Sequence, residues 1–420
     1  MGKEKWNYIL INGKSRFLKV KEPTFIKGKL TEIKDLVPFQ KKNEKDEVVE
    51  PTAEIANQEK RKIYSEFFKK PFKNLLVLSG AGSSMDVGGQ SMIQLWKKAE
   101  EKYLIKDGDT VKENGFELIC KSVNFDFSKT DLEALLSQID GYCKFAGDID
   151  IKLNGTDKKL SVIKTEIFKL IKKECTIKKP KENFPHKIFL EKVLQRKQTS
   201  PRVKIFTLNY DLLFEYAATE VNSIVIDGFS FTIPRTFSGR FFDYDIVQRE
   251  GSKLKEEDNF VQRVFHLHKL HGSLDWERNN ENKVEIKENS EQPLMVYPRD
   301  AKYEDSYEQP FFEMMARFQR NLRLNNDTLL ICIGYSFNDK HINTAIEEAL
   351  NQNPGFRLAV IDPGFDSDTV SKALSSIKKE ALSSERILMV SETFTDFSKY
   401  FPEIKTYENA NHEQLNLKNE

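Results

Sequence analysis

Six short, mostly apolar runs constrain the fold of this chain more than any other feature. A continuous apolar run such as 75–78 is typical of a strand buried on both faces of a parallel sheet. Most of the runs are separated by segments that can carry helices. The sequence therefore predicts an α/β fold built on a doubly wound, mostly parallel Rossmann-like sheet. The runs are 75–78, 203–208, 264–270, 329–333, 358–361 and 387–390.

The remaining segments predict how the chain is divided. Residues 1–70 are expected to form a small N-terminal appendage with two short strands around the Asn12-Gly13 turn, a charged linker and a helix. Residues 71–400 form the main domain, in which 100–200 is a mostly helical insertion. Residues 401–420 read as a polar tail. Within the insertion, an apolar stripe over 132–139 predicts a packing face, and Thr130 with Glu133 fits a capping box.

Composition excludes several classes of partner. The 66 Lys and Arg balance the 65 Asp and Glu, giving a net charge of +1, so no affinity for nucleic acid or membranes is indicated for the whole molecule. No apolar run is long enough to span a membrane, and the first 17 residues lack an apolar signal core. The four cysteines form no C-x-x-C pair, which indicates neither zinc nor a disulfide framework and makes the cytoplasm the simplest location.

A run of small residues, Gly80-Ala81-Gly82-Ser83-Ser84, directly follows the first apolar run. Glycines permit a tight turn and the close approach of a phosphate, and the start of a following helix would offer free N–H groups. The match to G-x-G-x-x-G is imperfect because Met85 replaces the third glycine, and no acidic residue follows an obvious second strand. The run favours a site that binds a dinucleotide, but it disfavours a standard dehydrogenase. The alternative is a plain tight turn between a strand and a helix.

Polar side chains also end the second run, in Thr207-Leu208-Asn209-Tyr210-Asp211. In open α/β sheets, ligands bind at the carboxyl ends of the strands. The Asn209 amide and the Asp211 carboxylate can bind ribose hydroxyls, a carboxamide or a water molecule. The alternative is that one of them caps a helix expected over 212–218.

Three of the six histidines fall within the third run and its end. Side chains alternate along a strand, so His266 and His268 share one face and His271 points to the other, which disfavours a three-histidine metal site. His271 stands at the strand end before Gly272, where a histidine can titrate near neutrality and act as a general base. A hydrogen-bonded structural histidine is the alternative.

The fourth and fifth runs end in turns of similar character. Gly334-Tyr335-Ser336-Phe337-Asn338-Asp339 is another turn that contains small residues, and Asp362-Pro363-Gly364 follows the next run. A carboxylate at the position of Asp362 can accept hydrogen bonds from both hydroxyls of a ribose. The alternative for Asp362 is an ordinary turn-forming residue.

Taken together and in this order, the turns at 80–84, 207–211, 269–273 and 334–336 resemble the sirtuin family. They are closest to the bacterial sirtuin-like branch found in antiphage defence systems. The resemblance spans roughly 74–390. It implies that NAD is bound and consumed, that His271 is the general base, that Asn209 holds the nicotinamide ribose or a water, and that Asp211 lies on the nicotinamide side.

The resemblance also implies a set of residues that bind the dinucleotide. The first turn would cradle the pyrophosphate, the later turns would contact the adenosine half, and the carboxylate would bind its ribose. The set is Gly80, Ala81, Gly82, Ser83, Ser84, Gly334, Ser336 and Asp362.

Two departures from the family pattern bear on the activity. Deacetylating sirtuins carry Gly-Ile-Pro-Asp-Phe-Arg after the first turn, where this chain has Met85-Asp86-Val87-Gly88-Gly89, and they carry a four-cysteine zinc module that is not expected here. The resemblance therefore implies an NAD+ hydrolase of antiphage defence, working as a homo-oligomer or with a partner such as a HerA-type ATPase. A protein deacylase or ADP-ribosyltransferase and a non-catalytic NAD or ADP-ribose sensor are the alternatives.

Overall fold

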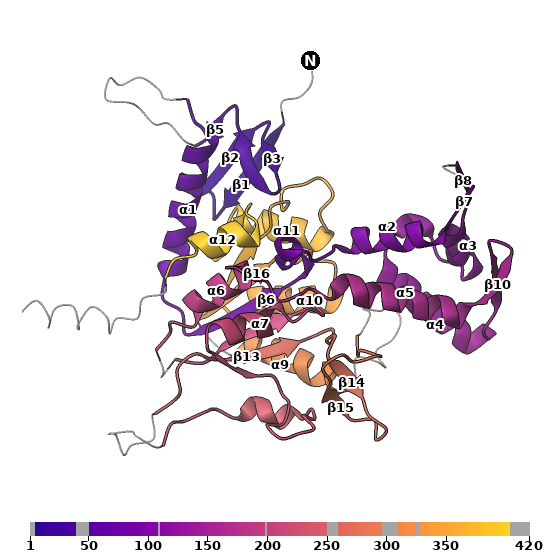
Figure 1. Ribbon diagram of the computed structural model, residues 1–420. Coiled ribbons are helices and arrows are strands. Elements are labelled where there is room, and N and C mark those ends of the chain that lie inside the picture. Colours follow the sequence, from indigo (N-terminus) through magenta and orange to yellow (C-terminus); the bar gives the residue numbers. More distant parts are fainter. Residues whose placement is uncertain are drawn as a thin grey trace, which may run out of the picture.

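The computed structural model describes residues 5–38, 50–107, 110–197, 200–249, 259–295, 309–324 and 327–403 (Figure 1). The predicted charged linker at 41–49 and most of the predicted polar tail lie outside these residues. No described helix is long and apolar enough to cross a membrane.

Within the described residues, one sheet of ten strands forms the centre of the molecule, in the order β12-β13-β11-β6-β16-β17-β18-β1-β2-β5. All pairings from β12 to β18 are parallel. The six predicted strands and the mostly parallel α/β fold are confirmed. The parallel strands are β6 (Asn74–Ser79), β11 (Val203–Thr207), β12 (Ile224–Ile226), β13 (Val264–Lys269), β16 (Thr328–Ile333), β17 (Arg357–Ile361) and β18 (Ile387–Val390).

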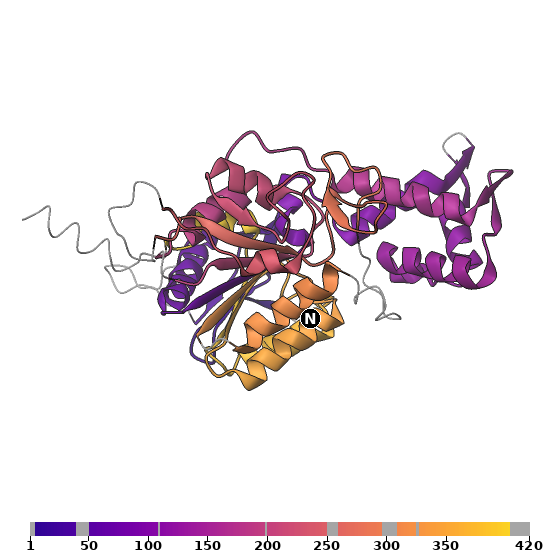
Figure 2. The same cartoon turned by 90° about the horizontal axis from the view of Figure 1, so that it is seen from below.

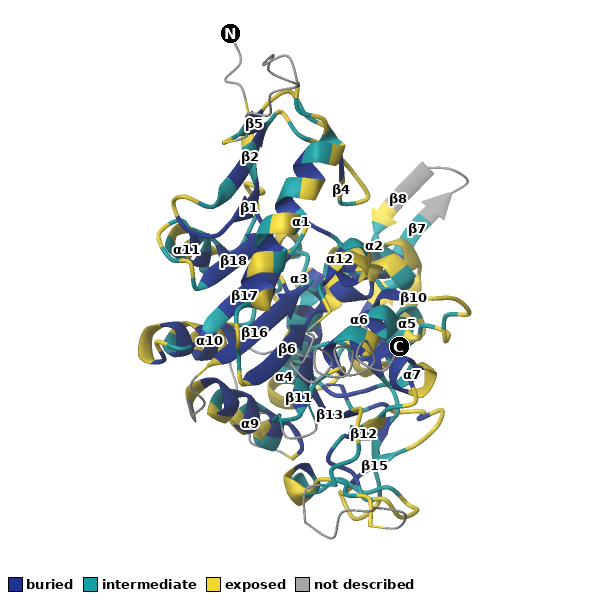
Figure 3. Ribbon diagram, turned by 90° about the vertical axis from the view of Figure 1, so that its left-hand side faces the viewer, coloured by how far each residue is buried: buried dark blue, intermediate teal, exposed yellow. Residues whose placement is uncertain are grey.

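Helices cover both faces of this sheet, which explains why most side chains of its strands are apolar (Figures 2 and 3). Alternate residues of β6 enter different cores: Leu75 and Val77 face one, whereas Leu76 and Leu78 face the other. The first core includes side chains of α1 (Ala53–Lys69), α6 (Pro185–Val193), α7 (Leu213–Glu220) and α12 (Phe394–Tyr400). The second includes side chains of α9 (Phe311–Leu324), α10 (Lys340–Gln352) and α11 (Lys372–Ala381).

The N-terminal segment, predicted to be an appendage, continues the central sheet. Its strand β1 (Trp6–Ile11) pairs antiparallel with β18, and β2 (Phe17–Lys21) and β5 (Leu36–Val37) follow outward. A hairpin of β3 (Thr24–Ile26) and β4 (Lys29–Glu32) completes it. The buried Lys60 of α1 donates to the Ser391 carbonyl at 2.8 Å and pairs with Glu392 at 3.1 Å, which ties α1 to the end of β18.

The insertion projects away from the sheet and has its own apolar core (Figures 1 and 2). The predicted stripe over 132–139 is buried in that core, as expected. The predicted capping box is wrong: Asp131 caps this helix by accepting from the Ala134 N–H at 2.9 Å, because Thr130 has a left-handed backbone with φ of 47°. The elements are α2 (Met92–Tyr103), β7 (Leu104–Asp107), β8 (Thr110–Asn114), α3 (Gly115–Ser122), α4 (Leu132–Ala146), β9 (Asp150–Leu153), β10 (Thr156–Lys159) and α5 (Leu160–Cys175).

Candidate active site at the carboxyl edge of the sheet

The sheet reverses its winding between β6 and β16. The chain leaves β6 toward β11 on one side, whereas it leaves β16 toward β17 on the other. Such a switch point separates two connections and is where open α/β sheets bind ligands. The turn at 80–84 follows β6 and the turn at 334–339 follows β16, so the structure brings these two predicted segments together.

Glycines allow these two turns to pack directly against each other. The Gly82 N–H donates to the Gly334 carbonyl at 2.9 Å. A Cβ atom on Gly80 would lie 2.7 Å from the Gly334 oxygen, and one on Gly334 would lie 2.4 Å from Gly82. Gly334 also has a φ of 58°, in the left-handed region that side chains disfavour. The glycines are therefore required for packing between the turns, and their role toward a phosphate stays a prediction.

The first turn continues into two short 3₁₀ helices, Ala81–Ser83 and Met85–Val87, and α2 starts only at Met92. The strand, turn and helix order is as expected, but the long helix begins only after these two short helices and not directly at the turn. Several backbone N–H groups of the turn donate to protein carbonyls, those of Ser83 to Gly80 and of Ser84 to Ala81 among them. A pyrophosphate at this turn would compete with these internal hydrogen bonds.

Asn209 joins the loop after β11 to this first turn. Its Nδ2 lies 3.1 Å from the Gly80 carbonyl and 3.1 Å from Ser83 Oγ. Ser84 Oγ, at 2.9 Å, is a third acceptor for the two N–H groups of the amide. Asn209 is thus no helix cap: its side chain spans from one strand end to the next, with Oδ1 as its remaining acceptor.

Asp211 closes the same network. Ser84 Oγ donates to its Oδ2 at 2.7 Å, and its Oδ1 accepts from the Leu213 N–H at 3.1 Å. The second contact reaches the first residue of α7, although the N-cap position of this helix is Leu212 and not Asp211. Burial raises the pKa of Asp211, against the hydrogen bond from Ser84 and the charge of Lys269. Asp211 therefore links the start of α7 to the first turn.

The Lys269 side chain fixes the loop that carries Asn209 and Asp211. Its buried Nζ donates to the Asp211 carbonyl at 2.5 Å and to Glu215 at 3.0 Å. Burial raises the pKa of Glu215 to about 7, although Lys269 opposes the shift. The last residue of β13 thus fixes the backbone that carries Asn209.

His271 lies at the same edge as Asn209. Thr207 of β11 pairs with Lys269 of β13, and each candidate residue follows its strand partner by two positions. His271 Nε2 lies 3.3 Å from Asp339 Oδ2, and the two side chains are only 14% and 13% exposed. The structure therefore brings a partly buried imidazole–carboxylate pair to the edge that carries Asn209.

Asp339 is fixed in place by the helix that it caps. Its Oδ1 accepts from the N–H groups of His341 at 2.9 Å and Ile342 at 3.1 Å, leaving Oδ2 for His271. Burial would raise the pKa of Asp339, but the hydrogen bond and charge of His271 lower it. In the tautomer that carries its hydrogen on Nε2, His271 donates to Asp339 and leaves Nδ1 as the acceptor of the ring.

The other two histidines of β13, His266 and His268, are buried side by side on one face of the strand, as predicted. His268 stacks between Phe206 and Phe242, with ring centroids 4.4 and 4.1 Å away. Burial lowers the pKa of His266 to about 4 and holds the pKa of His268 well below its usual range. Among the described residues, no group of three or more His, Cys, Asp or Glu side chains could hold a metal ion.

The residues expected near the adenosine half lie on the other side of the switch point. Ser336 is exposed in the turn after β16. Asp362 follows β17, and its Oδ1 accepts from the Gly364 N–H at 2.7 Å, the turn contact that had been the alternative. Burial raises the pKa of Asp362. Both residues lie on the carboxyl edge. None of the hydrogen bonds described above joins either of them to Asn209 or His271.

Sequence reasoning missed three residues of this site: Lys269, Asp339 and Glu133. Lys269 and Asp339 belong to the predicted turns at 269–273 and 334–339. The signal that could have identified them is a charged residue at or just after the end of an apolar strand. Glu133 belongs to the insertion, where its spacing suggested only a cap. Its carboxylate accepts from the Tyr210 hydroxyl at 3.0 Å.

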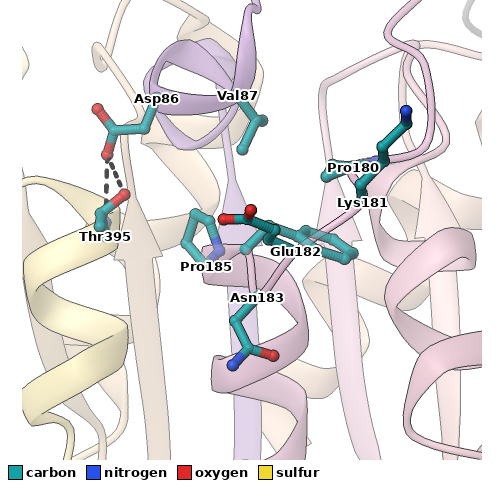
Figure 4. A pocket seen from close by; sticks show the side chains of 9 residues that line it. Asp86, Val87, Pro180, Lys181, Glu182, Asn183, Pro185 and Thr395 are labelled. Atoms are coloured by element: carbon teal, nitrogen blue, oxygen red, sulfur yellow. Dashed lines mark hydrogen bonds between the residues drawn. The ribbon is translucent and has the colours of Figure 1, made fainter.

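A separate hollow of about 420 Å³ lies between Met85–Val87, the segment before α6 and the start of α12 (Figure 4). Asp86 and Thr395 meet at its rim through a 2.5 Å hydrogen bond. None of its lining residues is a predicted site residue. The hollow is therefore distinct from the carboxyl-edge cluster of Asn209, His271 and Asp339.

The structure therefore defines an α/β protein of the doubly wound class, in which ligands bind at the switch-point edge. Residues 203–383 match the family model of the SIR2-like domain. This match includes Asn209, His271, Asp339 and Asp362, excludes the turn at 80–84, and supports the predicted resemblance to sirtuins.

Other comparisons add little. A solved structure titled "Structural Basis for the Mechanism and Regulation of Sir2 Enzymes" is 13% identical, with 81% of this chain and 94% of that chain covered and a TM-score of 0.37. No curated protein matches the chain.

Proposed function

We propose that this chain is an NAD+ hydrolase that releases nicotinamide and ADP-ribose. The observation that carries the proposal is the edge on which Asn209 and His271 follow the adjacent strands β11 and β13, and on which His271 meets Asp339. The match to a SIR2-like domain supports NAD as the substrate. We further propose that hydrolysis depletes NAD in antiphage defence in the cytoplasm, with activity controlled by homo-oligomerisation or by a HerA-type ATPase.

The residues at the carboxyl edge fit part of a dinucleotide, namely its sugars. The edge offers an amide oxygen on Asn209, a carboxylate on Asp362 and an exposed hydroxyl on Ser336, all of which can bind sugar hydroxyls. The turn at 80–84 uses several of its N–H groups internally, so a pyrophosphate would be bound there only after a local rearrangement. We assign the sugar contacts to the side chains on this basis.

The proposed reaction breaks the bond between ribose C1′ and the nicotinamide nitrogen. The electron pair of that bond neutralises the cationic ring nitrogen, so the leaving group requires no general acid. Water supplies the new oxygen at C1′ and loses a proton. His271 Nδ1 accepts that proton, directly or through a ribose hydroxyl, while Asp339 holds the imidazole and the positive charge that develops on it. Asn209 orients the water and the ribose face.

The test is nicotinamide release from NAD by the purified wild type, Asn209→Ala and His271→Ala. We expect each variant to lose on the order of 10²-fold in kcat, the usual contribution of a general base or orienting group. A suitable control is Asn353→Ala, which alters a buried amide at the end of α10. Folded variants that both match the wild type would show that these roles are wrong.

The same assay separates the alternative functions. A deacylase or ADP-ribosyltransferase would consume NAD only when an acylated or acceptor protein is present. A sensor would bind NAD or ADP-ribose, measured by calorimetry, without turnover. Nicotinamide release with NAD alone is the result that the proposed hydrolase requires.

A further inference from the structure

The helical insertion reaches the carboxyl edge through the first turn of α4. Glu133 lies in that turn, and its carboxylate accepts the hydrogen bond from the Tyr210 hydroxyl. Tyr210 stands between Asn209 and Asp211 in the chain. The insertion therefore contacts the loop that carries the proposed orienting residue.

Tyr210 belongs to two parts of the molecule at once. Its ring is buried in the apolar core of the insertion, together with residues such as Leu132 and Leu136. Its carbonyl accepts from the Leu274 N–H at 3.1 Å, on the segment after β13. The backbone of the loop is thus held by the sheet, whereas its central side chain is held by the insertion.

Glu133 also shares an electrostatic environment with the proposed base. Burial raises the pKa of Glu133 to about 7, the charge of His271 and the Tyr210 hydrogen bond oppose this shift, and Asp131 and Asp339 add to it. The charges of both members of the His271–Asp339 pair thus act on Glu133. A residue that served only the core of the insertion would have no such relation to the edge of the sheet.

We propose that Glu133 is a positioning residue: through Tyr210 it fixes the loop that carries Asn209, so the helical insertion is part of the catalytic apparatus. This inference deepens the proposed function and rests on it for the effect on turnover. The geometric part concerns the loop alone and can be measured without NAD.

The chain offers a matched control for this contact. Tyr103, at the far end of α2, donates through its hydroxyl to Glu166 at 2.8 Å, and its ring is buried in the same core. This pair repeats the tyrosine–glutamate chemistry in the outer part of the insertion (Figure 1). Tyr103→Phe therefore removes an equivalent hydrogen bond from the insertion without touching the loop.

The first measurement is amide hydrogen exchange over 207–212 in the protein without NAD. We expect Glu133→Ala and Tyr210→Phe to exchange several-fold faster there than the wild type, while Tyr103→Phe matches the wild type. Glu133→Gln keeps an acceptor for the Tyr210 hydroxyl and is expected to restore slow exchange. Unchanged exchange in both Glu133→Ala and Tyr210→Phe would overturn the proposal.

The second measurement is the kcat and KM of nicotinamide release by the same variants. We expect kcat to fall about tenfold in Glu133→Ala and Tyr210→Phe, the equivalent of one hydrogen bond, with KM little changed. Glu133→Gln should recover most of the loss. Faster exchange with unchanged kcat would refute the catalytic part. A wild type that releases no nicotinamide, either alone or with its co-purified partners, would instead refute the proposed hydrolase, and the exchange result would still decide the positioning of the loop.

Discussion

At the scale of single residues, Asp339 illustrates how one side chain serves structure and chemistry together. One carboxylate oxygen caps α10 and the other contacts His271. The cap holds the carboxylate still, so the imidazole meets a fixed partner. These two roles can be separated because asparagine caps helices about as well as aspartate but carries no charge.

We therefore predict that Asp339→Asn keeps its stability but loses activity. Its cap is retained, so the free energy of unfolding should change by less than about 1 kcal/mol. Loss of the charge beside His271 should lower kcat by about 10²-fold or more, because the imidazolium formed during proton uptake is no longer stabilised. Urea unfolding and nicotinamide release check the two halves. Equal activity of Asp339→Asn and wild type would contradict the pairing with His271.

At the scale of elements, β13 has different chemistry on its two faces. His266 and His268 point into an aromatic stack beneath the sheet, where burial keeps them neutral. Lys269 and the following His271 serve the carboxyl edge. The alternation of side chains along the strand separates these two groups, and it does so whatever ligand binds.

The neutral histidines predict acid sensitivity of the fold. Their pKa values are lowered in the native state, so below about pH 6.5 the unfolded chain binds more protons than the native chain. The free energy of unfolding therefore decreases as the pH is lowered, by about 1.4 kcal/mol per pH unit for each such group. His268→Phe keeps an aromatic ring in the stack and should make this dependence shallower between pH 7.5 and 5.5. Urea unfolding at both pH values tests this.

The matched control is His341→Gln at the exposed start of α10. A slope for His268→Phe that equals that of the wild type would contradict the buried neutral state of His268.

At the scale of the whole molecule, the fold is held by contacts between segments that are far apart in the chain. The turns at 80–84 and 334–339 pack backbone against backbone at the switch point, and the N-terminal strand β1 pairs with β18. The insertion, which has a separate core, meets the sheet at the loop of Tyr210. The proposed site therefore depends on the relative placement of these distant segments.

The contact between the turns predicts a large difference between two glycine substitutions. Gly334→Ala places a Cβ 2.4 Å from Gly82 at a φ of 58°, and should lower the free energy of unfolding by at least about 1–3 kcal/mol. Gly141→Ala, in the middle of α4 where an added Cβ meets nothing within 4 Å, should raise it by about 0.5–1 kcal/mol.

Thermal or urea unfolding of both variants provides the measurement. If Gly334→Ala were as stable as Gly141→Ala, the two turns would tolerate the separation that an added methyl group imposes on them. The comparison isolates the crowded turn from the general effect of replacing glycine by alanine, because both substitutions add the same methyl group.

The sequence alone determined the parallel sheet, its six central strands and the turns that follow them, because burial on both faces leaves a continuous apolar run and tight turns require small residues. Only the tertiary structure decided which polar groups meet. The pairing of His271 with Asp339, the bridge from Asn209 to the first turn, and the approach of Glu133 to Tyr210 each join residues more than 60 positions apart. Local pattern carries no record of such contacts, since strand order and the docking of the insertion set them.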